Sequence, residues 1–156
     1  MAKVVKNGVQ TIVTLDFGQW FYQEKQIQNI SEVDGIYVAH AGTIETINGK
    51  ELFTPDRVIY IGKGTGTDNV HVRVGKHKND DHQSWKRHLK AGEHILYSYA
   101  ECSKDIVSDV EAALIYKNKP QENTNSTENY TGNTHFINVK LTGQAVGTLK
   151  ETGLIL

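Results

Sequence analysis

The residues best suited to do chemistry are a glycine-rich loop, an Arg–His pair and a carboxylate on an apolar helix face. The loop lies in RVIYIGKGTG (57–66), and a glycine-rich loop after a strand often holds phosphate. It lacks the phosphate-binding pattern Gly-x-x-x-x-Gly-Lys-Ser/Thr, and Thr67 stands where a dinucleotide-binding loop needs its third glycine. Nucleotide binding is therefore disfavoured, and a flexible turn remains the alternative for the loop.

The Arg–His pair consists of Arg73 and His77, which lie four residues apart. If residues 69–79 are helical, both side chains share one face. A guanidinium matches two phosphate oxygens at once, and an imidazole can move a proton near neutral pH. The alternative is ordinary surface charge. Zinc is disfavoured because the four histidines of residues 71–88 match no common ligand spacing and no cysteine pair supports them.

The carboxylate is Glu111, whose neighbours along a helix are the apolar Val107, Leu114 and Ile115. An unpaired carboxylate is costly to bury, so such a group usually finds a cation, a metal or a hydrogen-bond partner. The alternative is a glutamate at the rim of the apolar stripe that reaches water.

Stretches with strand or helix patterns must position these groups. Asp16 can cap a helix that continues to about Asn29, because apolar residues follow at helical spacing. Asn48-Gly49 is a strong hairpin signal between two stretches rich in β-forming residues. The predicted strands are residues 35–43, 57–62, 94–102 and 135–141.

The predicted helices after the hairpin are residues 84–92 and 103–120, the second capped by Ser103 and ended by Pro120. Residues 69–79 remain open between strand and helix, because Val70, Val72 and Val74 alternate. Residues 121–134 are too polar to pack and are expected to form a loop. The order of elements predicts a mixed α+β domain.

Composition bounds the class of protein. The chain has 156 residues with 38% hydrophobic and 22% charged residues, which suits one globular domain, and no apolar run is long enough for a membrane. Its single cysteine, Cys102, allows no internal disulfide, so we expect a cytoplasmic location. The net charge of −1 gives no overall attraction to nucleic acid, but residues 71–90 hold six Lys/Arg against two Asp.

The order of several of these signals forms a family pattern. Gly-Ile-Tyr at 35–37 and Tyr-Ile-Gly at 60–62 are followed by Arg73, His77, Glu111 and Asn123. Over roughly residues 34–125 the chain resembles the GIY-YIG nuclease superfamily. The resemblance implies a small three-stranded antiparallel sheet flanked by helices, and it favours a helix over 69–79. Residues 1–33 would form an N-terminal helical extension, and residues 126–156 a tail with a short strand.

The same resemblance implies hydrolysis of DNA phosphodiester bonds with one divalent metal. The metal would be Mg²⁺, with Mn²⁺ as a substitute, and Glu111 would be its protein ligand. Arg73 would clamp the scissile phosphate. Tyr37 would activate the attacking water, alone or with His77 taking the proton, and Tyr60 would orient the water or the phosphate.

Further site residues are also implied. Asn123 would hold the site together by hydrogen bonds, and Lys63 would meet the nucleic acid backbone. The other basic residues expected on double-stranded DNA are Lys76, Lys78, Lys86 and Arg87.

Two departures from the family leave the biological role open. Twenty-two residues separate the two tripeptides, more than is common in the family, and no separate DNA-binding module is recognisable. A restriction-type or mobile-element enzyme, a structure-specific repair nuclease and a non-catalytic nucleic-acid- or protein-binding module therefore remain alternatives. A homodimer could form through Phe17, Trp20 and Phe21, or these aromatic side chains could pack on the domain's own sheet.

Overall fold

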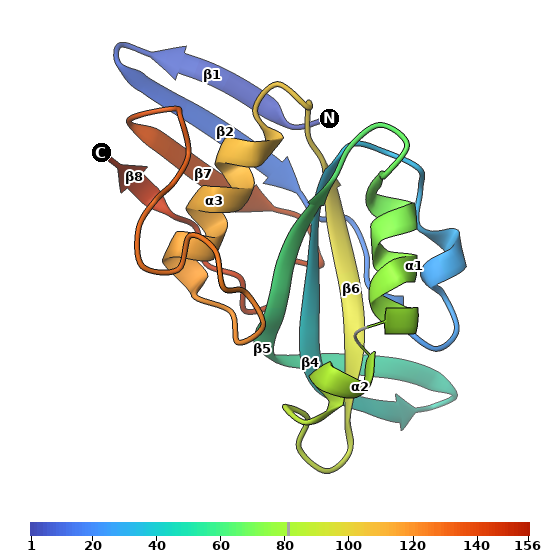
Figure 1. The fold of residues 1–156 in the computed structure, drawn as a ribbon. Coiled ribbons are helices and arrows are strands. Elements are labelled where there is room, and N and C mark those ends of the chain that lie inside the picture. The colour runs from blue at the N-terminus through green and yellow to red at the C-terminus, as the bar shows by residue number, and fades with distance from the viewer. Residues whose placement is uncertain (81) are drawn as a thin grey trace.

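The fold is built mainly from strands. The computed structural model describes residues 1–80 and 82–156, with 41% of the chain in strands and 18% in helices. The strands form two four-stranded sheets (Figure 1). The predicted combination of one three-stranded sheet with an N-terminal helical extension is therefore wrong.

The first sheet joins the two ends of the chain. Its strand order is β1 (Lys3–Asn7), β2 (Gln10–Asp16), β7 (Ile137–Thr142) and β8 (Gly153–Ile155). The sheet is mixed, because β2 and β7 run parallel whereas the other pairs are antiparallel. The C-terminal segment expected to be a tail thus supplies two strands to this sheet.

The second sheet carries both tripeptides and is antiparallel throughout. Its order is β3 (Phe21–Tyr22), β6 (Glu93–Glu101), β4 (Gly35–Ile47) and β5 (Lys50–Gly64). The predicted hairpin is confirmed: Asn48 and Gly49 join β4 to β5 with φ angles of 52° and 77°, as a tight two-residue turn requires.

The helices cover opposite faces of the second sheet (Figure 1). Helix α1 (Val70–Asp80) confirms the helical alternative for 69–79, and α2 (His82–Lys86) is shorter than predicted. Helix α3 (Val107–Asn118) packs with both sheets in one hydrophobic core, whereas α1 and Trp85 of α2 belong to a second core. A short 3₁₀ turn covers Ile27–Asn29. None of the described helices has both the length and the apolar character needed to cross a bilayer.

The N-terminal helix prediction failed because the backbone of this segment bonds to other strands. Leu15 is buried in β2, the Phe17 N–H donates to the Thr142 carbonyl at 2.9 Å, and the Gln23 N–H donates to that of Ile95 at 3.2 Å. Phe17 and Phe21 are 0% and 5% exposed, so they pack inside the molecule. Of the two alternatives for these aromatic residues, packing within the chain is therefore confirmed for Phe17 and Phe21, and they are not available as a dimer surface.

Candidate active site

The two tripeptides lie side by side on β4 and β5. Tyr37 pairs with Gly62 in the strand register, and the Tyr37 ring lies over Gly62. A Cβ atom added at Gly62 would lie 2.3 Å from both Cζ and Oη of Tyr37. Position 62 must therefore be glycine for the buried tyrosine ring to occupy this place.

Helix α1 brings His77 onto this tyrosine. Tyr37 Oη and His77 Nε2 are 2.6 Å apart, in a buried hydrogen bond between residues forty positions apart. The helix is anchored by Val70 and Val74, which are fully buried on the sheet. The spacing of four that placed Arg73 and His77 on one face therefore holds in the structure.

An aromatic cluster surrounds the imidazole. Trp85 of α2 is nearly parallel to the His77 ring, with centroids 4.8 Å apart and an interplanar angle of 29°. The Tyr60 ring lies 4.8 Å from the same imidazole. The cluster limits the ring orientation of His77 and so directs its Nε2 atom toward Tyr37. The role of Trp85 was not found in the sequence, where it formed part of an ordinary helix pattern.

Arg73 lies one helical turn before His77. Its guanidinium is half-buried, makes a long ion pair of 3.4 Å from Nη1 to Asp68 Oδ2, and also acts on the hydroxyls of Tyr37 and Tyr60. Its Nε atom is buried and has no hydrogen-bond partner among the described residues. Buried donors are usually satisfied, so the unused Nε leaves Arg73 with capacity for an acceptor such as a phosphate oxygen.

Glu111 reaches the site from the opposite face of the sheet. Burial raises the pKa of its carboxyl, while the charges of Lys63 and Arg73 oppose the rise. Lys63 is held toward α3 by a hydrogen bond from its Nζ to Ser108 Oγ at 2.7 Å. β5 is an edge strand, and α1 and α3 lie on either side of it (Figure 1). The charge of Arg73 acts on Glu111, so groups from the two helices come near each other at this edge.

The two tyrosine hydroxyls are both protonated at neutral pH. Burial raises the pKa of Tyr37, the neighbouring Tyr60 adds to the rise, and the Arg73 guanidinium opposes it. Burial also raises the pKa of Tyr60, with a further contribution from the charge of Glu111. Neither residue is therefore a ready-made phenolate, and Tyr37 needs an acceptor for its own proton.

Asn123 fastens the segment after α3 to the edge of β5. Its side-chain Nδ2 donates to the Ile61 carbonyl at 2.8 Å, and its Oδ1 accepts from the Ile61 N–H at 2.9 Å. The neighbouring Glu122 N–H donates to the Ile59 carbonyl at 3.0 Å. Asn123 thus contacts the main chain of Tyr-Ile-Gly.

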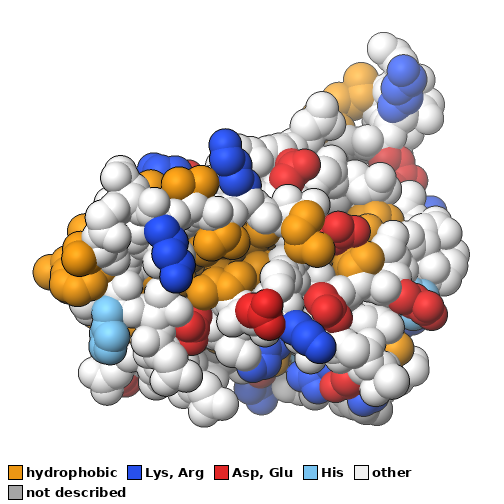
Figure 2. Space-filling model, turned by 90° about the horizontal axis from the view of Figure 1, so that it is seen from above, with side chains coloured by type: hydrophobic (Ala, Val, Ile, Leu, Met, Phe, Trp, Pro, Cys, Tyr) orange, Lys and Arg blue, Asp and Glu red, His pale blue; other side chains and the backbone are white. Residues whose placement is uncertain are grey.

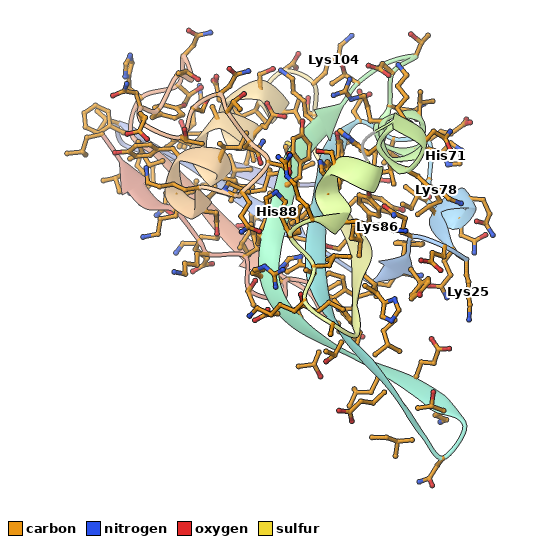
Figure 3. The ribbon with its side chains drawn as sticks, turned by 60° about the horizontal axis from the view of Figure 1, so that its bottom comes forward. Lys25, His71, Lys78, Lys86, His88 and Lys104 are labelled. Carbon is orange, nitrogen blue, oxygen red and sulfur yellow. The ribbon has the colours of Figure 1, made fainter. Side chains whose placement is uncertain are left out.

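The predicted DNA-binding side chains differ in what surrounds them. Lys76 Nζ lies 2.9 Å from Asp68, and Arg87 lies 3.4 Å from Glu122. Lys78 of α1 and Lys86 of α2 make no ion pair within the part of the chain that the structure describes (Figure 3). Acidic and basic side chains are interspersed on the face seen in Figure 2, so that face is not uniformly basic.

Glu111 is the one carboxylate that the described site offers as a metal ligand. Within residues 1–80 and 82–156, no three His, Cys, Asp or Glu side chains gather closely enough to bind a metal by themselves. Among the described residues Glu111 forms no ion pair; its carboxylate accepts a hydrogen bond from the Lys63 backbone and keeps further acceptor capacity that can serve a cation. Mg²⁺ commonly binds through one or two carboxylates and keeps several waters, which suits a site with this one carboxylate.

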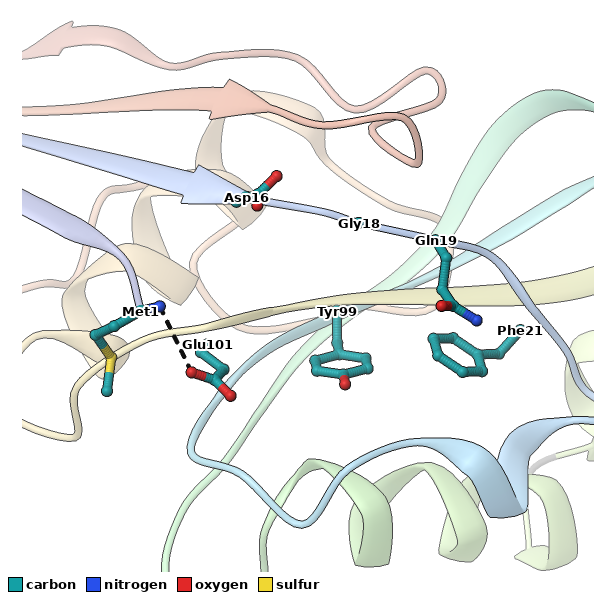
Figure 4. A pocket seen from close by; sticks show the side chains of 7 residues that line it. All are labelled: Met1, Asp16, Gly18, Gln19, Phe21, Tyr99 and Glu101. Atoms are coloured by element: carbon teal, nitrogen blue, oxygen red, sulfur yellow. Dashed lines mark ion pairs between the residues drawn. The ribbon is translucent and has the colours of Figure 1, made fainter.

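A separate cavity of about 240 Å³ lies beside the N-terminus and the end of β6 (Figure 4). The Met1 amino group there lies 3.5 Å from Glu101. None of the residues of the candidate active site lines this cavity. The candidate site is instead the surface over β5, between α1 and α3.

Comparisons of the chain with models of protein families, with curated proteins and with solved structures found no match.

Proposed function

We propose that the protein is a metal-dependent endonuclease that hydrolyses phosphodiester bonds of DNA. The observation that carries this proposal is the 2.6 Å hydrogen bond between Tyr37 Oη and His77 Nε2, formed beside the Arg73 guanidinium. Phosphodiester hydrolysis needs a base for water and a cation for the phosphate, and these three side chains provide both.

Tyr37 and His77 share the role of the base. Because burial raises the pKa of Tyr37, its hydroxyl keeps its proton in the free protein. As the attacking water gives a proton to Tyr37 Oη, the tyrosine proton passes to His77 Nε2. The hydroxide attacks phosphorus, and the P–O bond to the leaving oxygen breaks, so that this oxygen departs with the bonding electron pair. Tyr60, whose ring lies 6.1 Å from that of Tyr37, orients the water or the phosphate.

Arg73 and Glu111 stabilise the charge that grows during the reaction. The unused Nε of Arg73, together with the rest of its guanidinium, binds the non-bridging oxygens of the scissile phosphate. Glu111 would hold the Mg²⁺ ion, or Mn²⁺ in its place, and the ion would stabilise the phosphate and the leaving oxygen. Asn123 keeps the β5 edge in place through its two hydrogen bonds to Ile61.

DNA would approach over the surface between α1 and α3. Lys63, Lys78 and Lys86 would contact its backbone, and Lys76 and Arg87 would exchange their carboxylate partners for phosphate. With a net charge of −1 the protein has no general attraction to DNA, so binding depends on these local contacts and weakens with salt. The proposed compartment is the cytoplasm, where buried Cys102 would remain a thiol.

Nicking of supercoiled plasmid in Mg²⁺ tests the proposal. Wild-type protein should produce nicked circles before linear DNA, because one site cuts one strand per event. Glu111→Gln should slow nicking by roughly 10²-fold or more, the scale for removing one stabilising group at a reacting centre. The matched control is Glu128→Gln, a change at an exposed glutamate of the polar loop, which should cut like wild type.

Two results would overturn the proposal. One is wild-type protein that binds plasmid but yields no Mg²⁺-dependent product, which would favour a binding module. The other is Glu111→Gln protein that cuts at the wild-type rate. Parallel reactions with branched DNA would separate a structure-specific nuclease from one that cuts ordinary duplexes.

A further inference from the structure

The β4–β5 hairpin extends beyond the sheet that carries it. Pairing of β4 with β6 ends at Thr43 and Glu93, whereas pairing of β4 with β5 continues to Ile47 and Lys50. Residues 44–53 therefore form a ribbon of only two strands, which projects from the rest of the molecule (Figure 3). We call this ribbon the arm.

One face of the arm packs against the chain. Strand alternation places Ile44, Thr46, Glu51 and Phe53 on this inner face. The Phe53 ring lies 4.9 Å from that of Trp20, and Glu51 forms a 3.8 Å ion pair with Lys25. The inner face is thus held by the N-terminal segment.

The other face of the arm has no comparable cover. It consists of two cross-strand pairs, Glu45 with Leu52 and Ile47 with Lys50, and all four side chains are exposed. Ile47 and Leu52 are 49% and 51% exposed and lie on one diagonal of this outer face. Two aliphatic side chains at the end of a projecting ribbon form an apolar surface that a partner could bury.

The outer face is complementary to itself. A two-fold axis along the Ile47–Leu52 diagonal would place each of these residues against its own copy. The same axis would place Glu45 opposite Lys50 of the partner subunit, twice per interface. Neighbouring positions on one face are about 7 Å apart along a strand and about 5 Å apart across strands, so the charged ends can meet with small adjustments. The two ribbons would cross near right angles, as sheets packed orthogonally do.

We propose that the outer face of the arm binds the same face of a second copy of this chain. The two-fold contact buries the Ile47 and Leu52 side chains of both copies and pairs each Glu45 with the Lys50 of its partner. Charge favours a second copy over DNA. Within the arm, Glu45 and Glu51 outnumber Lys50, so the ribbon would repel phosphate.

The contact is small, so the expected affinity of the dimer is low. Standard interfaces bury about 800 Å² on each partner, and four side chains per copy provide less than that. The dimer should therefore be weak, with a dissociation constant on the order of 10–100 µM. Under the proposed nuclease activity, the dimer would bring two active sites into one particle.

Sedimentation of charge-reversal variants tests the contact without DNA. Glu45→Lys alone places lysine opposite lysine across the two-fold axis, and Lys50→Glu alone places glutamate opposite glutamate. Each variant by itself should dissociate at least about tenfold more readily than wild type, as expected for like charges placed in contact. An equimolar mixture of the two variants should associate as wild type does, because every cross-axis pair is again opposite in charge.

The matched control is Thr46→Lys, which adds a positive charge to the exposed part of the inner face and should leave association unchanged. Wild-type protein that stays monomeric at about 500 µM, well above the expected dissociation constant, would overturn the proposal. Single variants that associate as tightly as wild type would overturn it too. So would a mixture of the two variants that associates no more tightly than either variant alone. The readout does not depend on catalysis, so a failure here leaves the nuclease test untouched.

Discussion

Gly62→Ala is the smallest change that tests whether the position of Tyr37 matters. The new Cβ would lie 2.3 Å from Cζ and Oη of Tyr37, whereas carbon atoms in contact are separated by about 3.5 Å or more. The ring must therefore move by roughly 1 Å. It cannot move toward His77, whose Nε2 is already 2.6 Å away, so the shift stretches that hydrogen bond.

Two magnitudes follow from this displacement. Forcing an extra carbon into a packed core costs about 1–3 kcal/mol of unfolding free energy, which at this chain length lowers the Tm by about 2–4 °C per kcal/mol. A misplacement of about 1 Å in a reacting group can cost 10²-fold in rate. Gly62→Ala should therefore nick plasmid roughly 10²-fold more slowly at a temperature where it is fully folded.

Urea unfolding followed by circular dichroism and plasmid nicking together check this prediction. The matched control is Gly75→Ala in α1, where an added Cβ would meet nothing within 4 Å. That variant should gain about 0.5–1 kcal/mol from helix propensity and keep its activity. A Gly62→Ala protein with wild-type stability would refute the packing argument, and one with wild-type activity would refute the role of Tyr37.

Three further predictions concern single side chains of the site. Tyr37→Phe keeps the ring and removes the hydroxyl, so nicking should slow by roughly 10²-fold, the scale of general base catalysis; a fully active Tyr37→Phe beside an inactive Tyr60→Phe would exchange their roles. Arg73→Ala should lower kcat by roughly 10²-fold but weaken DNA binding less than tenfold, since one phosphate contact among several carries little affinity. Lys76→Ala on the same helix is the contrasting variant, which should weaken DNA binding and leave kcat unchanged. Equal losses of rate and binding in Arg73→Ala would make Arg73 a docking residue only. Burial raises the pKa of Glu111 above its ordinary 4.5. At pH values above the pKa in the folded protein, the charged carboxylate therefore lowers the free energy of unfolding. Glu111→Gln should then be more stable than wild type near neutral pH, with a gain that shrinks as pH falls; urea titrations at several pH values would disprove this if the gain were constant.

Local signals were sufficient for the elements in the middle of the chain. Asn48-Gly49 specified its hairpin because few other residue pairs accept two successive positive φ angles. Helix α3 was recognised from its apolar stripe. The helix begins later than predicted, with Ile106 at the N-cap position, and the predicted cap Ser103 instead accepts from the Asp105 N–H at 3.3 Å in the turn before it. These features depend on residues a few positions apart, which a sequence displays directly.

The N-terminal segment shows where local signals fail. The aromatic residues after Asp16 repeat at helical spacing, yet Phe17 bonds to Thr142 and Gln23 to Ile95. Parallel pairing of β2 with β7 also joins residues more than a hundred positions apart. Such partners decide between helix and strand through long-range hydrogen bonds and burial, which local propensity does not contain.

The candidate site divides in the same way. The sequence by itself determined which residue types follow one another, including both tripeptides, the Arg–His spacing of four and a glutamate among apolar neighbours. Only the tertiary structure decided that Tyr37 and His77 share a hydrogen bond, that Trp85 stacks on that imidazole, and that the charge of Arg73 acts on Glu111. The physical reason is that pKa values, unused donors and ring contacts depend on burial and on neighbours through space, and these come from elements that meet across the edge of β5.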